Sequence, residues 1–381
     1  MAKLALQNFS YLSQLSTLTL FVCADCNLGC AYCSYRGLPW DKRYMTLEVA
    51  SQAIDFLMKH SGQKISISFY GGEPLLNFKL IKETVAYTER LRYKYAKKIR
   101  YNLSTNGTIC DQTIINFLKK HHFHIAVSLD GPAMLHDKLR RFKNGRATHG
   151  IVVRNIKKYF SQCKNIVLLA CLAPANFKYF NAIYRYFYGF YRKYKMPAEF
   201  SLVSWGEDDP RFALSKARLK DFEKVIERGA VLTLEHSLKK KLTFDPLDFT
   251  SYIRRLEKSG FIYGRCGAGL KSLFVLPDGR LLPCHLMLNR RSCPVFGNIM
   301  DLRIINEQVR LAACRSSLAM PARCRKCRLN AICNANCPAC NLYYNNDNSI
   351  VYRPHCEIFK EKIEAAAWLK TKLAQSGVIF K

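Results

Sequence analysis

Four cysteines lie within eleven residues near the N-terminus, in the stretch VCADCNLGCAYCSY. Cys26, Cys30 and Cys33 follow a C-x3-C-x2-C pattern, and Cys23 precedes them. Zinc sites usually take four protein ligands, often as two C-x2-C pairs. Three thiolates in one tight loop instead suit a 4Fe–4S cluster whose fourth iron has no protein ligand. A zinc knuckle with Cys23 as its fourth ligand is the alternative, and otherwise Cys23 is a packed thiol.

Most of the other cysteines are concentrated toward the C-terminus. Nine of the 17 cysteines lie between residues 266 and 340, and Cys356 follows. Cys266 and Cys284 fit the spacing C-x12-G-x4-C around Gly279, and the turn residues PDGR predict a hairpin there. A second spacing, C-x2-C-x5-C-x3-C, is formed by Cys324, Cys327, Cys333 and Cys337. This loop-rich part has little apolar material for a core, so we expect metals to hold it together.

Composition places the chain among globular proteins of the cytoplasm. Hydrophobic residues make up 49% of it, and no stretch approaches the roughly 18 consecutive apolar residues of a spanning helix. The N-terminus has no convincing signal peptide, so we expect a cytoplasmic protein with no membrane partner. Because that compartment keeps thiols reduced, metal binding explains the cysteines better than disulfides do. Cys110, Cys163 and Cys171 stand apart and are expected to pack in a core.

The charge balance points to an acidic partner. The chain has 60 Lys and Arg residues against 28 Asp and Glu residues, which gives a formal net charge of +32. Nucleic acid, an acidic membrane surface and an acidic peptide are the partners that such an excess suggests.

The first half of the chain alternates β-rich runs with helical segments. Helices are expected at 46–60 and 177–194, among others. The expected strands are 17–23, 64–70, 99–105, 124–130, 165–172 and 198–205. Such alternation predicts parallel βαβ units and an α/β fold, in which chemistry lies where strands end. The first strand ends at the cysteine cluster, and the next three end in YGGEPLL, STNGT and SLDGP.

Four regions follow from this pattern. We expect a barrel-like domain over 1–205 and a charged, helical bridging region over 206–262. A Cys-rich domain over 263–360 and a C-terminal helix over 361–381 complete the chain.

The motifs resemble the radical S-adenosylmethionine (SAM) superfamily, whose signature is C-x3-C-x2-C after the first strand. The resemblance covers roughly residues 15–205 and implies a partial (β/α)6 TIM-like barrel with a SAM-binding 4Fe–4S cluster on Cys26, Cys30 and Cys33. The GGEP and STNG pieces match its second and third strand ends, and SLDGPAMLHDKLRR matches maturase-type members. The SAM-binding residues that the resemblance implies are Tyr32, Gly71, Gly72, Glu73, Ser104, Thr105, Asn106, Ser128 and Arg140. Of these, Glu73 would meet the amino group of SAM and Arg140 its carboxylate.

The chemistry that this resemblance implies is reductive. The open iron chelates SAM, and one electron yields a 5′-deoxyadenosyl radical that removes a hydrogen atom from the substrate. A flavodoxin- or ferredoxin-type protein would supply the electron. A non-catalytic electron-transfer protein is an alternative, but it leaves the open cluster and GGEP unexplained.

The C-terminal cysteines resemble the SPASM extension, which holds two auxiliary 4Fe–4S clusters. One cluster would be ligated by Cys324, Cys327, Cys333 and Cys356. The other would be held by Cys266, Cys284 and Cys337. Its fourth iron stays open, or takes Cys340, Cys293 or a non-cysteine ligand.

Members with this extension mostly modify peptides or proteins, so we expect a maturase that makes a thioether or carbon–carbon crosslink, or another oxidation, in a ribosomally made peptide. An anaerobic sulfatase-maturating, formylglycine-forming enzyme is the alternative. Those enzymes resemble one another in an Asp after the G-x4-C cysteine, where this chain has His285, a candidate catalytic base or a structural residue. A radical SAM enzyme acting on RNA is less favoured by the second cysteine pattern.

The expected partner is an acidic precursor peptide. Only about 22 residues precede the first cluster, so we expect no peptide-binding domain to be fused there. A separate peptide-recognition protein, or the catalytic domains themselves, would then bind the leader.

Overall fold

The computed structural model describes residues 15–38, 43–203, 209, 211–212, 214, 216–240, 244–257, 266–288, 293–306, 308–312, 322–333, 337–347 and 350–377. The expected domain boundaries near 205 and 262 lie outside these residues, as do the first 14 residues and the last four. In the described part of the chain, no helix is long and apolar enough to cross a membrane.

Nine strands form one sheet within the described residues. The sheet runs in the order β6-β5-β4-β3-β2-β1-β7-β8-β9. The strands of the first half are β1 (Leu15–Cys23), β2 (Ser61–Gly71), β3 (Lys98–Thr105), β4 (His124–Ser128), β5 (Ile166–Leu172) and β6 (Ala198–Leu202). Each of these six pairs in parallel with the next, which confirms the six expected strands within a few residues at each end.

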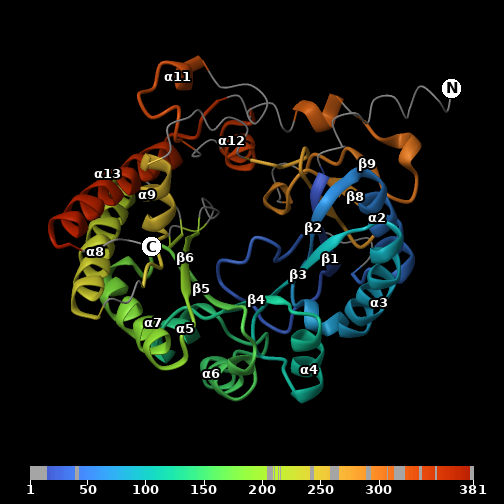
Figure 1. Cartoon of the computed structure of the whole chain (residues 1–381), viewed down its shortest axis with the longest axis horizontal. Coiled ribbons are helices and arrows are strands. Elements are labelled where there is room, and N and C mark those ends of the chain that lie inside the picture. Colours follow the sequence, from blue (N-terminus) through green and yellow to red (C-terminus); the bar gives the residue numbers. More distant parts are fainter. Residues whose placement is uncertain are drawn as a thin grey trace.

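Helices cover the outside of this curved sheet, so the first half is a partial (β/α)6 barrel (Figure 1). These helices are α2 (Leu47–His60), α3 (Phe78–Lys94), α4 (Gln112–Lys120), α5 (Ala133–Leu139), α6 (His149–Lys158) and α7 (Phe180–Tyr194). The expected helix at 46–60 is α2, whose N-cap Thr46 accepts a hydrogen bond from Val49 N. The expected helix at 177–194 begins with a short 3₁₀ turn, Phe177–Tyr179, before α7.

Side chains on the strands alternate between two environments. On β5, every second residue from Ile166 to Leu172 is buried, and the residues between them are partly exposed. Because successive strand residues point to opposite faces, the buried set packs under the helices and the other set faces the barrel interior. The same alternation holds on β2, where Ile65, Ile67 and Phe69 are buried. The main hydrophobic core therefore lies between the sheet and its outer helices.

The C-terminal part joins the barrel through the sheet. Three more strands extend the sheet: β7 (Ser272–Val275), β8 (Arg280–Leu282) and β9 (Gly297–Asn298). β7 pairs in parallel with β1, and β8 pairs antiparallel with both β7 and β9. The hairpin expected at PDGR connects β7 and β8, and Gly279 adopts φ +87° there, a backbone conformation that favours glycine. The small Cys-rich domain thus extends the barrel sheet directly.

The long C-terminal helix α13 (Arg353–Gln375) packs against the long helix α8 (Lys216–Lys240) and the shorter helix α9 (Phe249–Glu257), on the side of the molecule where β6 lies (Figure 1). The expected C-terminal helix starts earlier than 361, because α13 begins at Arg353 with Pro354 in its first turn, where a missing N–H is harmless. Cys356 therefore lies at the start of this helix. The remaining Cys-rich helices are short: η5 (His285–Met287), α11 (Ala322–Arg325) and α12 (Pro338–Asn345).

Candidate active site

The loop that carries Cys26, Cys30 and Cys33 lies at the carboxyl end of β1. Two backbone hydrogen bonds to the C-terminal end of α5 and the residues that follow hold this loop in place. Gly29 N donates to Arg141 O at 2.8 Å, and Ala31 N donates to Leu139 O at 2.9 Å. This pairing brings the residues around Arg140 against the cysteine loop. Cys23 is fully buried at the end of β1, and its thiol donates to the carbonyl of Asp25.

The glycines of GGEP let the ends of β1 and β2 come very close. Gly72 N donates to Cys23 O at 2.7 Å. A Cβ atom at Gly71 would lie 2.2 Å from Cys23 O, and one at Gly72 would lie 2.4 Å from Asp25 O. Only glycine fits these two positions, so they shape the start of the cysteine loop.

Glu73 ties the ends of β2 and β3 together. Its side chain is fully buried; Oε1 accepts from Leu75 N and from the Thr105 hydroxyl at 2.8 Å, and Oε2 accepts from Asn106 N at 2.7 Å. Burial raises the pKa of Glu73 to about 7, against the effect of these donors. A carboxylate has about four acceptor positions, so one remains on Oε2 for a further donor. Contact with the amino group of SAM stays a prediction.

Asn106 lies directly against the cysteine loop. Its amide nitrogen donates to Asn27 Oδ1 at 2.8 Å and approaches Cys26 Sγ at 3.7 Å. Its amide oxygen accepts from the backbone and the hydroxyl of Thr108. Ser104 precedes this pair of buried residues, Thr105 and Asn106, and its side chain faces the barrel interior. The polar end of β3 therefore orients the first cluster cysteine.

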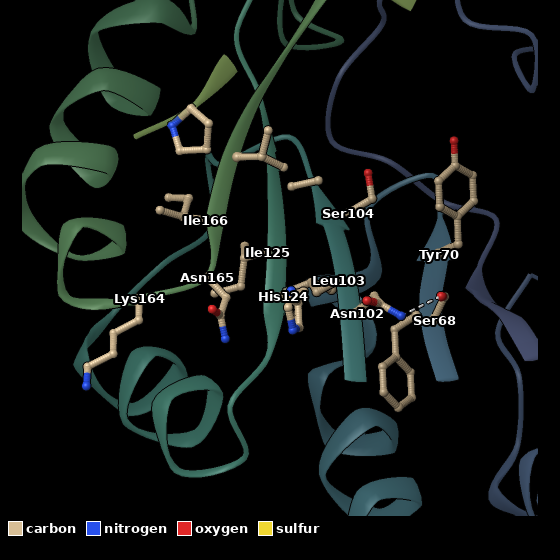
Figure 2. Close-up of a pocket in the computed structure, with 14 residues that line it drawn as sticks. Ser68, Tyr70, Asn102, Leu103, Ser104, His124, Ile125, Lys164, Asn165 and Ile166 are labelled. Carbon is tan, nitrogen blue, oxygen red and sulfur yellow. Dashed lines mark hydrogen bonds between the residues drawn. The ribbon is translucent and has the colours of Figure 1, made fainter. Parts of the chain in front are cut away.

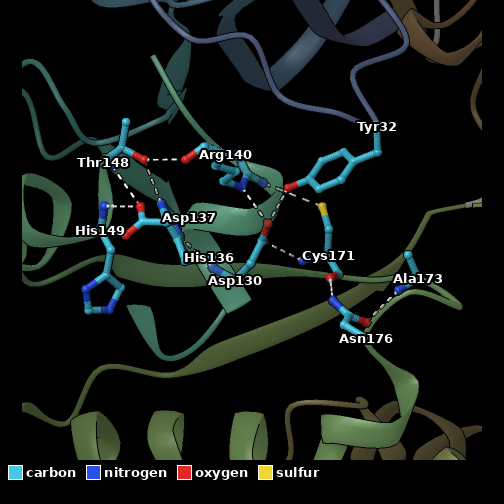
Figure 3. Close-up of polar contacts among 10 residues, drawn as sticks. All are labelled: Tyr32, Asp130, His136, Asp137, Arg140, Thr148, His149, Cys171, Ala173 and Asn176. Atoms are coloured by element: carbon cyan, nitrogen blue, oxygen red, sulfur yellow. Dashed lines mark hydrogen bonds and ion pairs between the residues drawn. The ribbon is translucent and has the colours of Figure 1, made fainter. Parts of the chain in front are cut away.

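A buried ion pair connects the ends of β4 and β5 to the cysteine loop (Figure 3). Arg140 is 8% exposed, and its Nε lies 2.8 Å from Asp130 Oδ2. Its Nη2 donates to Cys171 Sγ at 3.6 Å, and the guanidinium lies 5.2 Å from the ring centre of Tyr32. The Tyr32 hydroxyl donates to the same Asp130 oxygen. Tyr32 and Arg140 thus meet at one carboxylate. Ser128 lies at the end of β4, two residues before Asp130.

His136 helps to position Asp130 directly, and Arg140 through Thr148 (Figure 3). The Thr148 hydroxyl donates to Arg140 O at 2.7 Å, so it accepts from His136 Nε2, and His136 Nδ1 accepts from Asp130 N at 3.2 Å. This requires the neutral ring with its proton on Nε2. Burial lowers the pKa of His136 to about 4, which keeps that form at neutral pH.

Sequence reasoning assigned no role to Asp130, His136 or Cys171. The first two lie in the SLDGPAMLHDKLRR stretch, so the signal was present, but only the fold brings them onto Arg140. Cys171 was expected in a core, and it packs against the small hydrophobic cluster formed by Leu139, Ala173, Val203 and Phe212 at the carboxyl end of β5. Cys163 is buried as expected, and Cys110 packs against the main core.

The donor set of the loop fits an iron–sulfur cluster. Burial raises the pKa of Cys26 and raises that of Cys30 to about 12, so thiolates there need a positively charged partner. Nearby Arg140 favours the thiolate of Cys30. Within the described residues, no three His, Cys, Asp or Glu side chains converge on a single ion. Each iron of a 4Fe–4S cluster takes its own thiolate, so a cluster does not require that convergence.

The C-terminal cysteines form two groups. Cys324 interacts electrostatically with Cys327 and Cys356, and Cys333 packs against Phe359 of the same helix as Cys356. In the other group, Cys284 and Cys337 pack against one hydrophobic cluster, and Cys266 precedes β7. The Cys337 thiol is hydrogen-bonded to the Cys340 thiol and to the backbone amides of Cys340 and Ala339. These hydrogen bonds lower the pKa of Cys337 to about 7. These placements are consistent with the two predicted ligand sets, which remain predictions.

His285 follows Cys284 and lies between the two halves of the molecule. Its ring centre is 5.1 Å from that of Tyr70, at the end of β2, and its Nδ1 is 3.8 Å from Cys284 Sγ. Burial lowers the pKa of His285 to about 4, so the ring is neutral at pH 7 and able to accept a proton only weakly.

Comparisons with known proteins agree with this architecture. The family model described as the radical SAM superfamily matches residues 20–187, and the iron–sulfur cluster-binding SPASM domain matches residues 266–328. The cysteine-type anaerobic sulfatase-maturating enzyme of Clostridium perfringens strain 13 is 25% identical over 90% of this chain and 94% of its own length.

Two solved structures share the fold. Native anSMEcpe with bound AdoMet and Cp18Cys peptide has a TM-score of 0.76 and 21% identity, over 95% of this chain and 99% of that chain. SuiB of Streptococcus suis, bound to its precursor peptide SuiA, has a TM-score of 0.64 and 16% identity, over 91% and 78% of the two chains. The strand-end motifs, both cysteine patterns and these matches lead to one assignment: the chain is a radical SAM enzyme with a C-terminal SPASM domain.

Proposed function

We propose that this enzyme is a peptide maturase that abstracts a hydrogen atom from a residue of a ribosomally made peptide and so leads to a thioether or carbon–carbon crosslink, or to another oxidation. The observation that carries the proposal is the convergence of four strand ends on the cysteine loop. Asn106 contacts Cys26, and Arg140 contacts Tyr32 beside Cys30.

When bound, the barrel cluster and SAM supply a 5′-deoxyadenosyl radical. Cys26, Cys30 and Cys33 would hold that cluster, and Gly71 and Gly72 place the end of β2 directly against the start of their loop. Arg140 presents a cation to the carboxylate of SAM, and its ion pair with Asp130 keeps the guanidinium in one orientation. Tyr32 covers this ion pair and limits the access of water.

Three observations support a peptide as the substrate. The net charge of +32 suits an acidic chain. The relatives of known function include sulfatase-maturating enzymes, and two structures of the same fold were solved with bound peptides. A leader peptide rich in Asp and Glu would gain fast encounter from the basic surface, and the mouth of the barrel would fix its position.

A second candidate is formylglycine formation in a sulfatase, which the likeness to the Clostridium perfringens enzyme along 90% of this chain favours. We place it second because His285 stands where those enzymes resemble one another in an Asp.

The test uses the anaerobically reconstituted enzyme with SAM, dithionite and two kinds of peptide. One kind carries the cysteine or serine of a sulfatase, and the other kind comprises the small acidic peptides encoded beside the gene. The proposal predicts that a gene-neighbour peptide loses hydrogen atoms without becoming reactive toward a hydrazide probe. Hydrazide-reactive sulfatase peptide would establish the second candidate instead, and modification of RNA alone would refute both.

A further inference from the structure

A cavity of about 540 Å³ lies inside the barrel, below the mouth that carries the cysteine loop (Figure 2). It extends from Tyr70 and Ser104, near the carboxyl ends of β2 and β3, to His124 and Lys164 at the opposite end of the strands. The interior of a closed parallel barrel is usually filled by layers of bulky branched side chains. Here the interior is open, and polar side chains stand among the apolar ones that line it.

The polar lining forms a belt across neighbouring strands. Ser68 on β2 pairs with Asn102 on β3, and Asn102 pairs with His124 on β4. Asn165, whose carbonyl accepts from Ile125 N, continues the row before β5. One level of the barrel is therefore polar on four adjacent segments, and we call Ser68, Asn102, His124 and Asn165 the polar belt.

Hydrogen bonds within the belt leave donors available to a ligand. Asn102 Nδ2 donates to Ser66 Oγ at 2.7 Å and to Ser68 Oγ at 3.0 Å. Each hydroxyl thus accepts from Asn102, and neither has an acceptor of its own among the described residues. Of the two, Ser68 lines the cavity, so its hydroxyl proton is left to donate into it, which favours a ligand with an acceptor oxygen.

The charges around the cavity have one sign. Its lining contains Lys164 and no Asp or Glu. Arg100 lies two residues before Asn102 on β3, so it faces the same side, and no described residue forms a salt bridge with Arg100 or Lys164. Burial, with a smaller effect of Arg100, lowers the pKa of His124, so the uncharged ring can also take part in hydrogen bonds.

We propose that this cavity binds a carboxylate of the substrate peptide, through the hydroxyl donor of Ser68 in the polar belt and the positive charge of Arg100 and Lys164. The inference rests on the proposed function, because it assumes that the substrate is a peptide. Ser104 lines the cavity and is followed by Thr105 and Asn106, which contact the Glu73 carboxylate and Cys26. An acidic residue held in the cavity would therefore set the register of the carbon that reacts above it.

The test measures the binding of glutarate, a dicarboxylate, and of its uncharged diamide, glutaramide, to the reconstituted enzyme by calorimetry. We expect glutarate to bind at least about tenfold more tightly than glutaramide, as charge-assisted hydrogen bonds require. Equal affinities, or no measurable binding of glutarate, would overturn the proposal.

Two pairs of variants locate the binding. Lys164→Glu should weaken glutarate binding about tenfold or more, whereas Lys157→Glu on the exposed face of α6 makes the same charge change and should leave it within about twofold. Asn102→Leu should also weaken binding, and Asn116→Leu on α4 is its exposed control. If Asn102→Leu fails to fold, the comparison of Lys164→Glu with Lys157→Glu still tests the site. Equal losses of glutarate affinity in these two variants would refute a site in the barrel.

Failure of this site and failure of the proposed function give different results. One outcome is that the enzyme modifies no peptide, yet glutarate binds and its binding weakens in the variants as predicted. This result would support an anion site in the barrel and refute its assignment to a peptide. Peptide modification that neither glutarate nor Lys164→Glu affects would refute the site and leave the proposed function standing. Tighter binding of a short RNA than of glutarate, lost in Lys164→Glu, would refute the peptide assignment.

Discussion

The two cysteine-bearing regions are held together in different ways. In the barrel, the loop of Cys26 to Cys33 is fixed by bonds from distant strand ends, such as Ala31 N to Leu139 O and Asn106 to Asn27. Around Cys324, the described residues form mainly local turns, such as Cys327 N to Cys324 O at 3.1 Å. The barrel site is thus shaped by the protein itself, whereas we expect the C-terminal segment to need metal ligation for a stable fold. Loss of a cluster should therefore have different consequences in the two regions.

The largest effect is expected from replacing Cys26, Cys30 and Cys33 together by Ala. Formation of 5′-deoxyadenosine should fall to the background of SAM and dithionite without enzyme, because no ligand remains for the barrel cluster. Iron should fall from about twelve to about eight atoms per chain, and the melting temperature should change little. Chromatography of the reaction and iron analysis measure this, with Cys110→Ala as the control.

Replacing Cys327 by Ala should act on folding first. Metal ligation supplies much of the folding free energy in such segments, so we expect a loss of soluble protein as well as of activity. Cys110→Ala is again the control, because Cys110 is partly exposed and lies outside both cysteine patterns. Soluble, fully active Cys327→Ala protein without that cluster would show that the two regions do not differ in this way.

Arg140→Lys probes the barrel site without touching a cysteine. Lysine cannot reproduce the contacts with Asp130, Cys171 and the Tyr32 ring together, so we expect SAM binding to weaken by about 10–100-fold. The neighbouring Arg141→Lys is the matched control, since the Arg141 side chain is exposed and donates only to the Gly145 carbonyl in the described structure, and the substitution leaves the backbone bond to Gly29 in place. Comparable losses in both variants would argue against a specific role for Arg140.

A smaller effect should appear in the pH dependence of stability. The pKa of His136 is lowered from its ordinary 6.5 to about 4, so between these values the unfolded chain binds a proton that the folded chain does not. Its contribution is complete above pH 6.5 and is lost as the pH falls toward 4, by up to about 3 kcal/mol in the free energy of unfolding.

Denaturant unfolding of His136→Asn and wild type between pH 7.5 and 5 isolates this term, because His285 and His355 titrate in both proteins. The variant should lose part of the slope, and the exposed control His122→Asn should keep it. Parallel curves for His136→Asn and wild type would contradict the neutral ring.

The sequence predicted the strand-end motifs well, because parallel strands place all their carboxyl ends at one edge. It did not predict the joining of β7 to β1, since strand pairing between residues some 255 apart leaves no local pattern. The positions of Asp130, His136 and Cys171 depend on bonds across three segments, and residue types alone do not reveal them. The alternation of polar and apolar residues in KISISF on β2 indicates that one face of this strand is polar. Only the fold shows that this polar face lines the barrel interior.

Electron paramagnetic resonance of the dithionite-reduced enzyme, recorded with and without SAM, tests most directly whether the barrel cluster has an iron open to SAM. The Cys26/Cys30/Cys33→Ala variant supplies the spectrum of the C-terminal clusters alone. We predict that SAM shifts the part of the wild-type spectrum that the variant lacks and leaves the variant spectrum unchanged. A wild-type spectrum indifferent to SAM, or a shift that persists in the variant, would contradict the assignment of SAM binding to the barrel loop.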